Sequence, residues 1–143
     1  MDPPCTFCRI VAREAEASIA YEDADVLAFM DLRAFHPGHT LVIPKAHIVD
    51  ICALDDDAVS RSLMNALSRV ARAVRSAFAP DGLSVWQSNG EAAGQEVFHL
   101  HFHIVPRSQD DGMLRVYPAR VTAATRADLD EHAARIRDAI DAT

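Results

Sequence analysis

The stretch His99-Leu100-His101-Phe102-His103-Ile104-Val105 decides the fold of this chain, because it alternates histidine with apolar residues. In a β-strand successive side chains point to opposite faces, so the three imidazoles would form a row on one face and the apolar residues would face the core. A helix would scatter the same residues over two faces. We therefore predict a strand over residues 97–105.

The remaining chain contains further strand and helix patterns. Apolar runs bounded by polar turns predict strands at 19–21, 26–30, 40–43 and 83–87, and a short helix is expected at 5–13. Residues 55–79 carry one apolar stripe at helical spacing, formed by Val59, Leu63, Leu67, Val70, Val74 and Phe78. A final helix is expected at 127–140, following Thr125, which we expect to be its N-cap. These elements predict an α+β domain: an antiparallel sheet of about five strands, one long helix packed on it and a C-terminal helix.

Composition excludes several classes of protein. The 143 residues include 14 Lys plus Arg and 21 Asp plus Glu, for a net charge of −7, which disfavours a nucleic acid partner. No apolar run approaches the ~20 residues of a membrane-spanning helix, and the N-terminus does not resemble a secretory signal. Three cysteines fit a disulfide framework poorly. We expect a single domain in the reducing cytoplasm, without membrane contact.

The row of histidines also points to chemistry. One isolated histidine is usually structural, but three in strict alternation with an apolar face behind them favour a functional site. Imidazole can act near neutral pH as a nucleophile, acid, base or metal ligand.

The chain resembles the histidine triad family of nucleotide hydrolases and transferases. Residues 99–105 match its His-x-His-x-His-x-x signature, and further similar segments lie in the same order at residues 28–31, 36–45, 89–90 and 93–98. The resemblance covers residues 5–108, with residues 109–143 as an extension that carries the last helix. It implies a histidine triad fold and a homodimer, which is the usual assembly of the family.

The resemblance also implies a mechanism. His101, the middle of the triad of His99, His101 and His103, would attack the α-phosphorus of an adenosine phosphoramidate, a dinucleoside polyphosphate or a related purine nucleotide conjugate. A covalent nucleotidyl-histidine would form, and water would then displace it. His103 and the backbone amides near Glu96 and Val97 would stabilise charge on the phosphate oxygens.

Glu96 departs from part of the family, whose animal phosphoramidases place Ser or Thr there. A carboxylate beside a phosphate is repelled unless it turns away or is protonated. The contact to the leaving group would therefore pass to Gln95, Asn89 or His103. The phosphoramidase branch also has a Trp-containing tail, whereas the only tryptophan of this chain is Trp86 and its last segment is expected to be a helix.

Nucleotide-binding roles follow from the same resemblance. Asp31 would accept hydrogen bonds from the ribose hydroxyls, and Asn89 would contact the phosphate or leaving group. His39 would support the triad from the turn after Gly38. The full predicted nucleotide-binding set is Phe7, Phe29, Asp31, Leu32, His39, Asn89, Gln95, Val97 and His103, with Phe7, Phe29 and Leu32 around the base.

Cys5-Thr6-Phe7-Cys8 contains a pair of cysteines with the spacing of half a zinc site. Taken alone, the pair could equally be a redox pair or two reduced thiols, and His47 has no other explanation. Zinc-bearing bacterial members of the family imply the ligand set Cys5, Cys8, His47 and His99. Four protein ligands leave no open position, so such a zinc ion would be structural. The third cysteine, Cys52, is expected to be a small buried residue.

Two functions therefore compete. One is an enzyme of the histidine triad type, and the other is a zinc-stabilised module that binds or senses purine nucleotides without turnover. The intact His101 favours the enzyme, because binding requires hydrogen-bond donors but no nucleophile.

Overall fold

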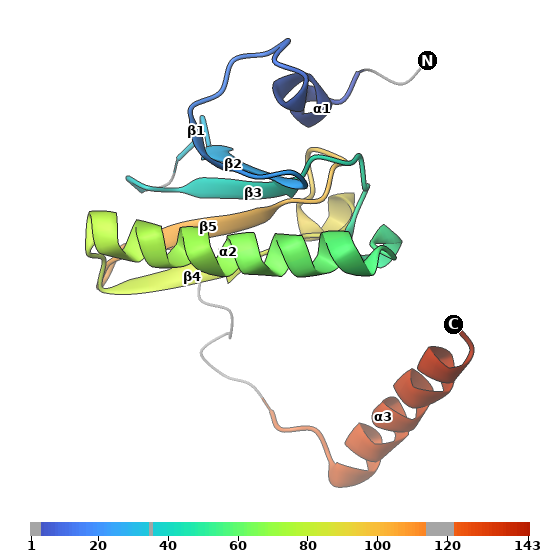
Figure 1. Ribbon diagram of the computed structural model, residues 1–143. Helices are drawn as coiled ribbons and strands as arrows, with labels where there is room; N and C mark the ends of the chain where they lie inside the picture. The colour runs from blue at the N-terminus through green and yellow to red at the C-terminus, as the bar shows by residue number, and fades with distance from the viewer. Residues whose placement is uncertain (1–3, 35, 114–121) are drawn as a thin grey trace. The chain divides into compact units, whose positions relative to one another are not determined.

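Five antiparallel strands form one sheet, as the sequence predicted (Figure 1). The strands are β1 (Ile19–Glu22), β2 (Val26–Met30), β3 (Thr40–Pro44), β4 (Gly82–Trp86) and β5 (Phe102–Arg107), in the spatial order β1-β2-β3-β5-β4. The structure is a computed structural model that describes residues 4–34, 36–113 and 122–143. The chain divides into two compact units, residues 1–111 and 112–143, and the sheet belongs to the first.

Both faces of the central strands β2 and β3 are covered, which explains why these strands are continuous apolar runs. Helix α2 (Asp57–Phe78) covers one face, and α1 (Thr6–Val11) lies by the other (Figure 1). The core on the α2 side includes Val26, Ala28, Val42, Leu100 and Ile104 from the sheet side. The core on the α1 side consists of Phe7, Ile10, Leu27, Phe29, Leu41 and Ile43.

The long helix has clear start and stop signals. The Asp56 carboxylate accepts hydrogen bonds from the backbone N–H groups of Ala58 and Val59, at 2.8 and 3.0 Å, and caps the helix. Its C-cap, Ala79, has a left-handed backbone conformation, directly before Pro80. The predicted helix is therefore confirmed. It begins two residues later and ends one residue earlier than expected.

The last member of the predicted apolar stripe is not in the core. Phe78 is 47% exposed, and its ring covers the turn that precedes β3. A Cβ atom on Gly38 would lie 2.7 Å from this ring, and Gly38 has a φ angle of +92°. Only glycine fits this position without strain, so the turn that delivers His39 depends on it.

The predicted strand at 97–105 is wrong at both ends, since β5 begins at Phe102 and ends at Arg107. Its ladder with β3 starts at the pair Val42 and Phe102. Further along β3, Pro44 has no N–H to donate, and its carbonyl accepts a hydrogen bond from the His99 side chain instead of a strand partner. Leu100 donates its N–H to the Ile48 carbonyl at 2.6 Å. The residues before Phe102 are thus held by loops, although Leu100 and Ile104 still share the face toward α2.

The second unit contains helix α3 (Arg126–Asp141), close to the predicted bounds. Thr125 caps it, because its hydroxyl oxygen accepts from the N–H of Asp128 at 3.1 Å. The described residues of this helix are not buried. Part of the predicted extension, residues 114–121, lies outside the described residues.

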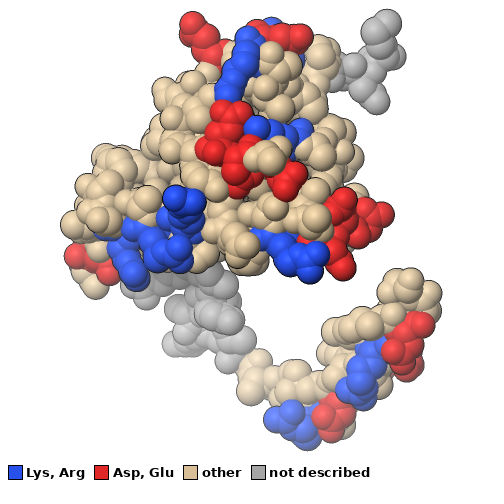
Figure 2. Space-filling model, viewed as in Figure 1, with Lys and Arg blue, Asp and Glu red and all other residues tan. Residues whose placement is uncertain are grey.

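The surface carries both signs of charge. On the face drawn in Figure 2, acidic and basic side chains lie side by side over the first unit. No helix in the described parts of the chain has the length and apolar character needed to cross a bilayer.

Candidate active site and metal centre

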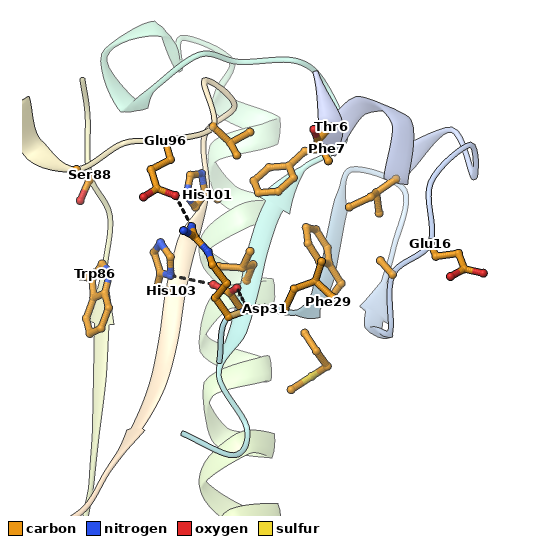
Figure 3. A pocket seen from close by; sticks show the side chains of 18 of the residues that line it. Thr6, Phe7, Glu16, Phe29, Asp31, Trp86, Ser88, Glu96, His101 and His103 are labelled. Carbon is orange, nitrogen blue, oxygen red and sulfur yellow. Dashed lines mark hydrogen bonds and ion pairs between the residues drawn. The ribbon is translucent and has the colours of Figure 1, made fainter. Parts of the chain in front are cut away.

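A cavity of about 560 Å³ opens beside the histidine motif (Figure 3). This volume suits a small-molecule ligand. Its walls come from α1, the ends of β2 and β4, β5 and the loop before the motif. The lining residues are Thr6, Phe7, Ile10, Glu16, Ala17, Phe29, Met30, Asp31, Leu32, Arg33, Leu41, Trp86, Ser88, Ala93, Gly94, Glu96, Val97, His101 and His103.

One end of the cavity is apolar. Phe7 and Phe29 pack edge to face, with ring centroids 5.3 Å apart. Phe7 comes from α1, and Phe29 comes from β2, where alternation turns it away from the α2 core. Ile10 and Leu41 complete this end, which offers aromatic and aliphatic surface to a flat ligand group.

His101 lies between this apolar end and the polar end of the cavity. Its ring stands edge to face with Phe7, with centroids 5.2 Å apart, and its Nδ1 lies 2.7 Å from the backbone carbonyl oxygen of His99. A carbonyl oxygen can only accept, so Nδ1 carries the proton and donates it. In the neutral ring the lone pair is then on Nε2. This arrangement leaves His101 a nucleophilic nitrogen on the side away from the backbone.

His103 is the centre of a polar cluster. Its Nδ1 lies 2.9 Å from Nε2 of the buried His39 and 3.9 Å from the Asp31 carboxylate, which is itself 3.4 Å from His39 Nε2. The Trp86 ring stacks on His103, with centroids 5.4 Å apart and planes at 29°. His103 and His101 have ring centroids 5.1 Å apart. The ring of His103 is therefore fixed on several sides.

Burial keeps the histidines of this cluster neutral. It lowers the pKa of His103 to about 4, helped by the neighbouring His101 and His39, while Asp31 acts in the opposite direction. Burial also lowers the pKa of His39, again against the effect of Asp31. Near neutral pH, His103 therefore acts as a hydrogen-bonding group without a positive charge.

A second cluster holds four candidate metal ligands. The Sγ atoms of Cys5 and Cys8 lie 3.5 and 3.6 Å from Nδ1 of His99, and Cys8 Sγ lies 3.2 Å from Nδ1 of His47. All four ligand atoms lie within 4.8 Å of one another. Ligands at ~2.0–2.3 Å from one tetrahedral zinc ion would be separated by comparable distances. The predicted ligand set is therefore brought together.

The chemistry of these donors also fits a cation. His99 donates from Nε2 to the Pro44 carbonyl at 2.8 Å, which leaves the Nδ1 lone pair directed at the thiols. Burial and the adjacent Cys5 thiol raise the pKa of the Cys8 thiol to about 11. Two neighbouring thiolates are unfavourable unless a cation lies between them. Cys52, predicted to be buried, is instead exposed in a short 3₁₀ helix (Ile51–Ala53).

Some predicted site residues lie elsewhere. The Asn89 side chain accepts from the N–H of Ile51 and bonds with Gln87, and neither Asn89 nor Gln95 lines the cavity. Gln95 is buried, and its amide bonds with Gly90 N–H and with the carbonyls of Val49 and Val97. Both side chains therefore hold loops in place. Leu32 lines the cavity at its rim and is 98% exposed.

Sequence reasoning missed Trp86 and Arg33. Trp86 reaches the cavity because β4 pairs with β5 in a register that places it opposite His103. Arg33 follows β2, lines the cavity and forms an ion pair with Glu96. For Arg33, the only signal in the sequence was that a basic residue follows Asp31 by two positions.

The fold and this cavity define a small α+β protein with a histidine-based site. Residues 12–110 match the family model described as "HIT domain", so the chain belongs to that family. A crystal structure of a HIT family member from Bacillus subtilis is 39% identical, with a TM-score of 0.88 over 95% of this chain and 96% of that one.

Two further relatives bear on the site. A zinc-bound histidine triad family protein from Mycobacterium smegmatis is 38% identical, with a TM-score of 0.71 over 82% of this chain and 84% of that one. Adenosine 5′-monophosphoramidase HNT1 of Saccharomyces cerevisiae is 33% identical over 123 residues, 85% of this chain and 75% of that protein. The family thus includes a zinc-bound member and an enzyme that acts on a nucleotide.

Proposed function

We propose that the protein is a nucleotide hydrolase or nucleotidyl transferase that forms a covalent nucleotidyl-histidine at His101. The observation that carries this proposal is the hydrogen bond from His101 Nδ1 to the His99 carbonyl, which directs the Nε2 lone pair away from the backbone. The substrates would be adenosine phosphoramidates, dinucleoside polyphosphates or related purine nucleotide conjugates. The similarity to an adenosine 5′-monophosphoramidase supports this class.

The reaction would proceed in two displacements at the α-phosphorus. The Nε2 lone pair of His101 forms a bond to phosphorus, and the electron pair of the bond to the leaving group departs with that group. Water then attacks the same phosphorus, loses a proton to solvent and returns the bonding pair to Nε2, which releases the nucleoside monophosphate. A different acceptor in place of water would give nucleotidyl transfer.

The cavity offers a place for each part of such a substrate. Phe7 and Phe29 would contact the base, and Asp31 would accept hydrogen bonds from the ribose hydroxyls. His103 would donate a hydrogen bond to a phosphate oxygen, with the backbone near Glu96 and Val97. Gln95 and His39 would act from behind the cavity, by fixing the loop and the His103 ring.

We also propose that Cys5, Cys8, His47 and His99 bind one structural zinc ion. The distances and the buried, preoriented His99 support this, as does the zinc-bound relative. The ion would tie α1, and with it Phe7, to the segment that precedes His101. It would supply no chemistry to the reaction.

A homodimer in the cytoplasm is the expected state of the protein. The support for the dimer is the family resemblance together with β4, an edge strand of the sheet whose Val85 is 46% exposed. Sedimentation velocity at micromolar concentration would measure the mass directly. A monomer would contradict this part of the proposal.

The decisive experiment is to trap the covalent adduct. We would mix the protein with adenosine 5′-phosphoramidate or diadenosine triphosphate and quench in denaturant at alkaline pH, since histidine–phosphorus bonds are labile in acid. Intact-mass analysis should show one added nucleoside monophosphate on the parent chain and on the control His132→Ala, and none on His101→Ala. Tight binding of AMP without adduct or product would instead indicate the nucleotide-binding module.

A further inference from the structure

Arg33 and Glu96 form an ion pair at the polar end of the cavity (Figure 3). The two residues are 63 positions apart: Arg33 follows β2, and Glu96 precedes the histidine motif. Both line the cavity together with His101 and His103. Their side chains are 78% and 65% exposed, so the pair lies at the open side of the site.

The other charged side chains of the lining determine how much positive charge this pair offers to a ligand. Among the described residues of the lining, Arg33 is the one Lys or Arg side chain, whereas Glu16, Asp31 and Glu96 are acidic. The Glu16 carboxylate points away from the cavity in Figure 3. His103 adds no positive charge near neutral pH, because burial lowers its pKa to about 4. Arg33 is therefore the one fixed positive charge of the lining, and Glu96 already neutralises it.

The pair lies where a leaving group would be. A substrate with its base against Phe7 and Phe29 and its α-phosphorus at His101 would extend its remaining group toward Glu96, Ser88 and Trp86, on the other side of His101 in Figure 3. That group meets the Glu96 carboxylate, which its ion pair with Arg33 holds in the ionised form, with its pKa below the usual value.

We propose that the Arg33–Glu96 pair selects substrates by the charge of the leaving group, in favour of phosphoramidates and against phosphate or sulfate leaving groups. This inference rests on the proposed function. It adds that Glu96, which takes the place of a neutral hydroxyl residue in part of the family, sets the substrate class.

The chemistry of the two kinds of leaving group explains the selection. A phosphoramidate nitrogen takes a proton from solvent before the bond to phosphorus breaks, so positive charge develops next to the Glu96 carboxylate. When His101 attacks, the phosphorus–nitrogen electron pair departs with the nitrogen, which leaves as a neutral amine. A phosphate or sulfate leaving group instead gains negative charge there, facing Glu96 and an arginine that is already paired.

The test is a comparison of kcat/KM for adenosine 5′-phosphoramidate and for diadenosine triphosphate, with adenylyl sulfate as a second anionic case. The amide-to-anhydride ratio is kcat/KM for adenosine 5′-phosphoramidate divided by kcat/KM for diadenosine triphosphate. Because the intrinsic reactivities of the two substrates are the same for every variant, they cancel when this ratio is compared between variants. Glu96→Gln should lower the ratio about tenfold, because it removes the carboxylate and releases Arg33 to bind the anion. Arg33→Gln should raise the ratio about threefold or more, because Glu96 is then unpaired.

Matched controls come from the exposed ion pair of Arg13 and Glu22, whose residues do not line the cavity. Arg13→Gln and Glu22→Gln should leave the ratio within twofold of the parent. Melting temperatures would establish that all four variants are folded.

Three results would overturn the inference. A ratio that neither Arg33→Gln nor Glu96→Gln shifts by twofold, or that both shift in the same direction, defeats it while the proposed function stands. A parent protein that turns over none of the substrates defeats the proposed function and this inference together.

Discussion

His99 and His103 lie four residues apart in one motif, yet they contact different kinds of groups. His99 is fully buried and faces the thiols of Cys5 and Cys8. His103 lines an open cavity and contacts His39, Asp31 and the Trp86 ring. We call the first region the thiol cluster and the second the histidine pocket, and His101 belongs to the pocket.

Backbone carbonyls account for the difference between the two regions. The Pro44 carbonyl accepts from Nε2 of His99, so the lone pair on Nδ1 faces the thiols. The His99 carbonyl accepts from Nδ1 of His101, so the lone pair on Nε2 is left for the cavity. Two neighbouring imidazoles thus have opposite tautomers, one suited to a metal and the other to nucleophilic attack.

Alanine substitutions in the two regions should separate turnover from stability. His101→Ala should reduce turnover by ~10³-fold or more, because the covalent route is lost. AMP affinity should stay within about threefold of the parent, since base and ribose contacts lie elsewhere. We would measure single turnover, AMP binding by calorimetry and thermal unfolding. Retention of a tenth of the parental rate would contradict the role of His101.

Metal removal should produce the opposite pattern. A ligand present at about 100 times its Kd adds ~2.7 kcal/mol to stability, and in a unit of the size of residues 1–111 each kcal/mol shifts Tm by about 4 °C. A strong chelator should therefore lower Tm by roughly 10 °C or more and remove about one zinc per chain. Cys8→Ser should also lower the zinc content and the Tm, with a smaller effect on initial turnover. Cys52→Ser, at an exposed thiol outside the cluster, serves as the control. Protein that contains no zinc and gains no stability when zinc is added would show that Cys5 and Cys8 are ordinary thiols.

Much of the difference between the thiol cluster and the histidine pocket can be predicted from the sequence, because it depends on side-chain alternation. Leu100 and Ile104 face the α2 core as predicted, and the histidines between them are free to face the other way. The spacing of Cys5 and Cys8 indicated half of a metal site, and the family resemblance added His47 and His99, which the structure brings together with the two thiols. The alternation of side chains extends beyond the strand itself: Leu100 faces the α2 core, although β5 begins only at Phe102.

Other features depend on contacts that a local pattern does not reveal. Asn89 and Gln95 are polar residues near the motif, but their amides already bond with other protein groups, among them the Ile51 N–H and the Val49 carbonyl of a distant loop. The position of Trp86 follows from strand register, and the Arg33–Glu96 pair depends on two loops that meet only in the folded chain. Exact partners over such sequence distances require the three-dimensional structure.

Removal of the Trp86 ring should affect the histidine pocket alone. Trp86→Leu would free the His103 ring on one side, and we expect turnover to fall about tenfold, because the donor to the phosphate is then less well oriented. Trp86→Phe preserves an aromatic face and should stay within about threefold. Single-turnover rates with zinc content as a second measurement would test this. Equal rates for Trp86→Leu and Trp86→Phe would mean that the stacked ring does not position His103.

The smallest expected effect is a pH dependence of stability that originates in the histidine pocket. The pKa of His103 is lowered to about 4, chiefly by burial, against an ordinary value of 6.5. The groups that face it are His101, His39, Asp31, Arg33 and the uncharged Trp86 ring. Between pH 6.5 and 4 the unfolded chain binds a proton at this residue and the folded chain does not. Acidification through this range therefore favours unfolding, and the contribution of His103 is complete above pH 6.5.

The variant His103→Asn isolates this contribution. Asparagine cannot be protonated, so the Tm difference between parent and variant should become less favourable to the parent by a few °C as the pH falls from about 7 to 5. Loss of metal on acidification affects both proteins alike and cancels in the difference. His132→Asn, at an exposed histidine on α3, serves as the control substitution. A Tm difference between parent and His103→Asn that stays constant with pH would mean that His103 titrates alike in the folded and unfolded chains, and that burial in the pocket does not keep it neutral.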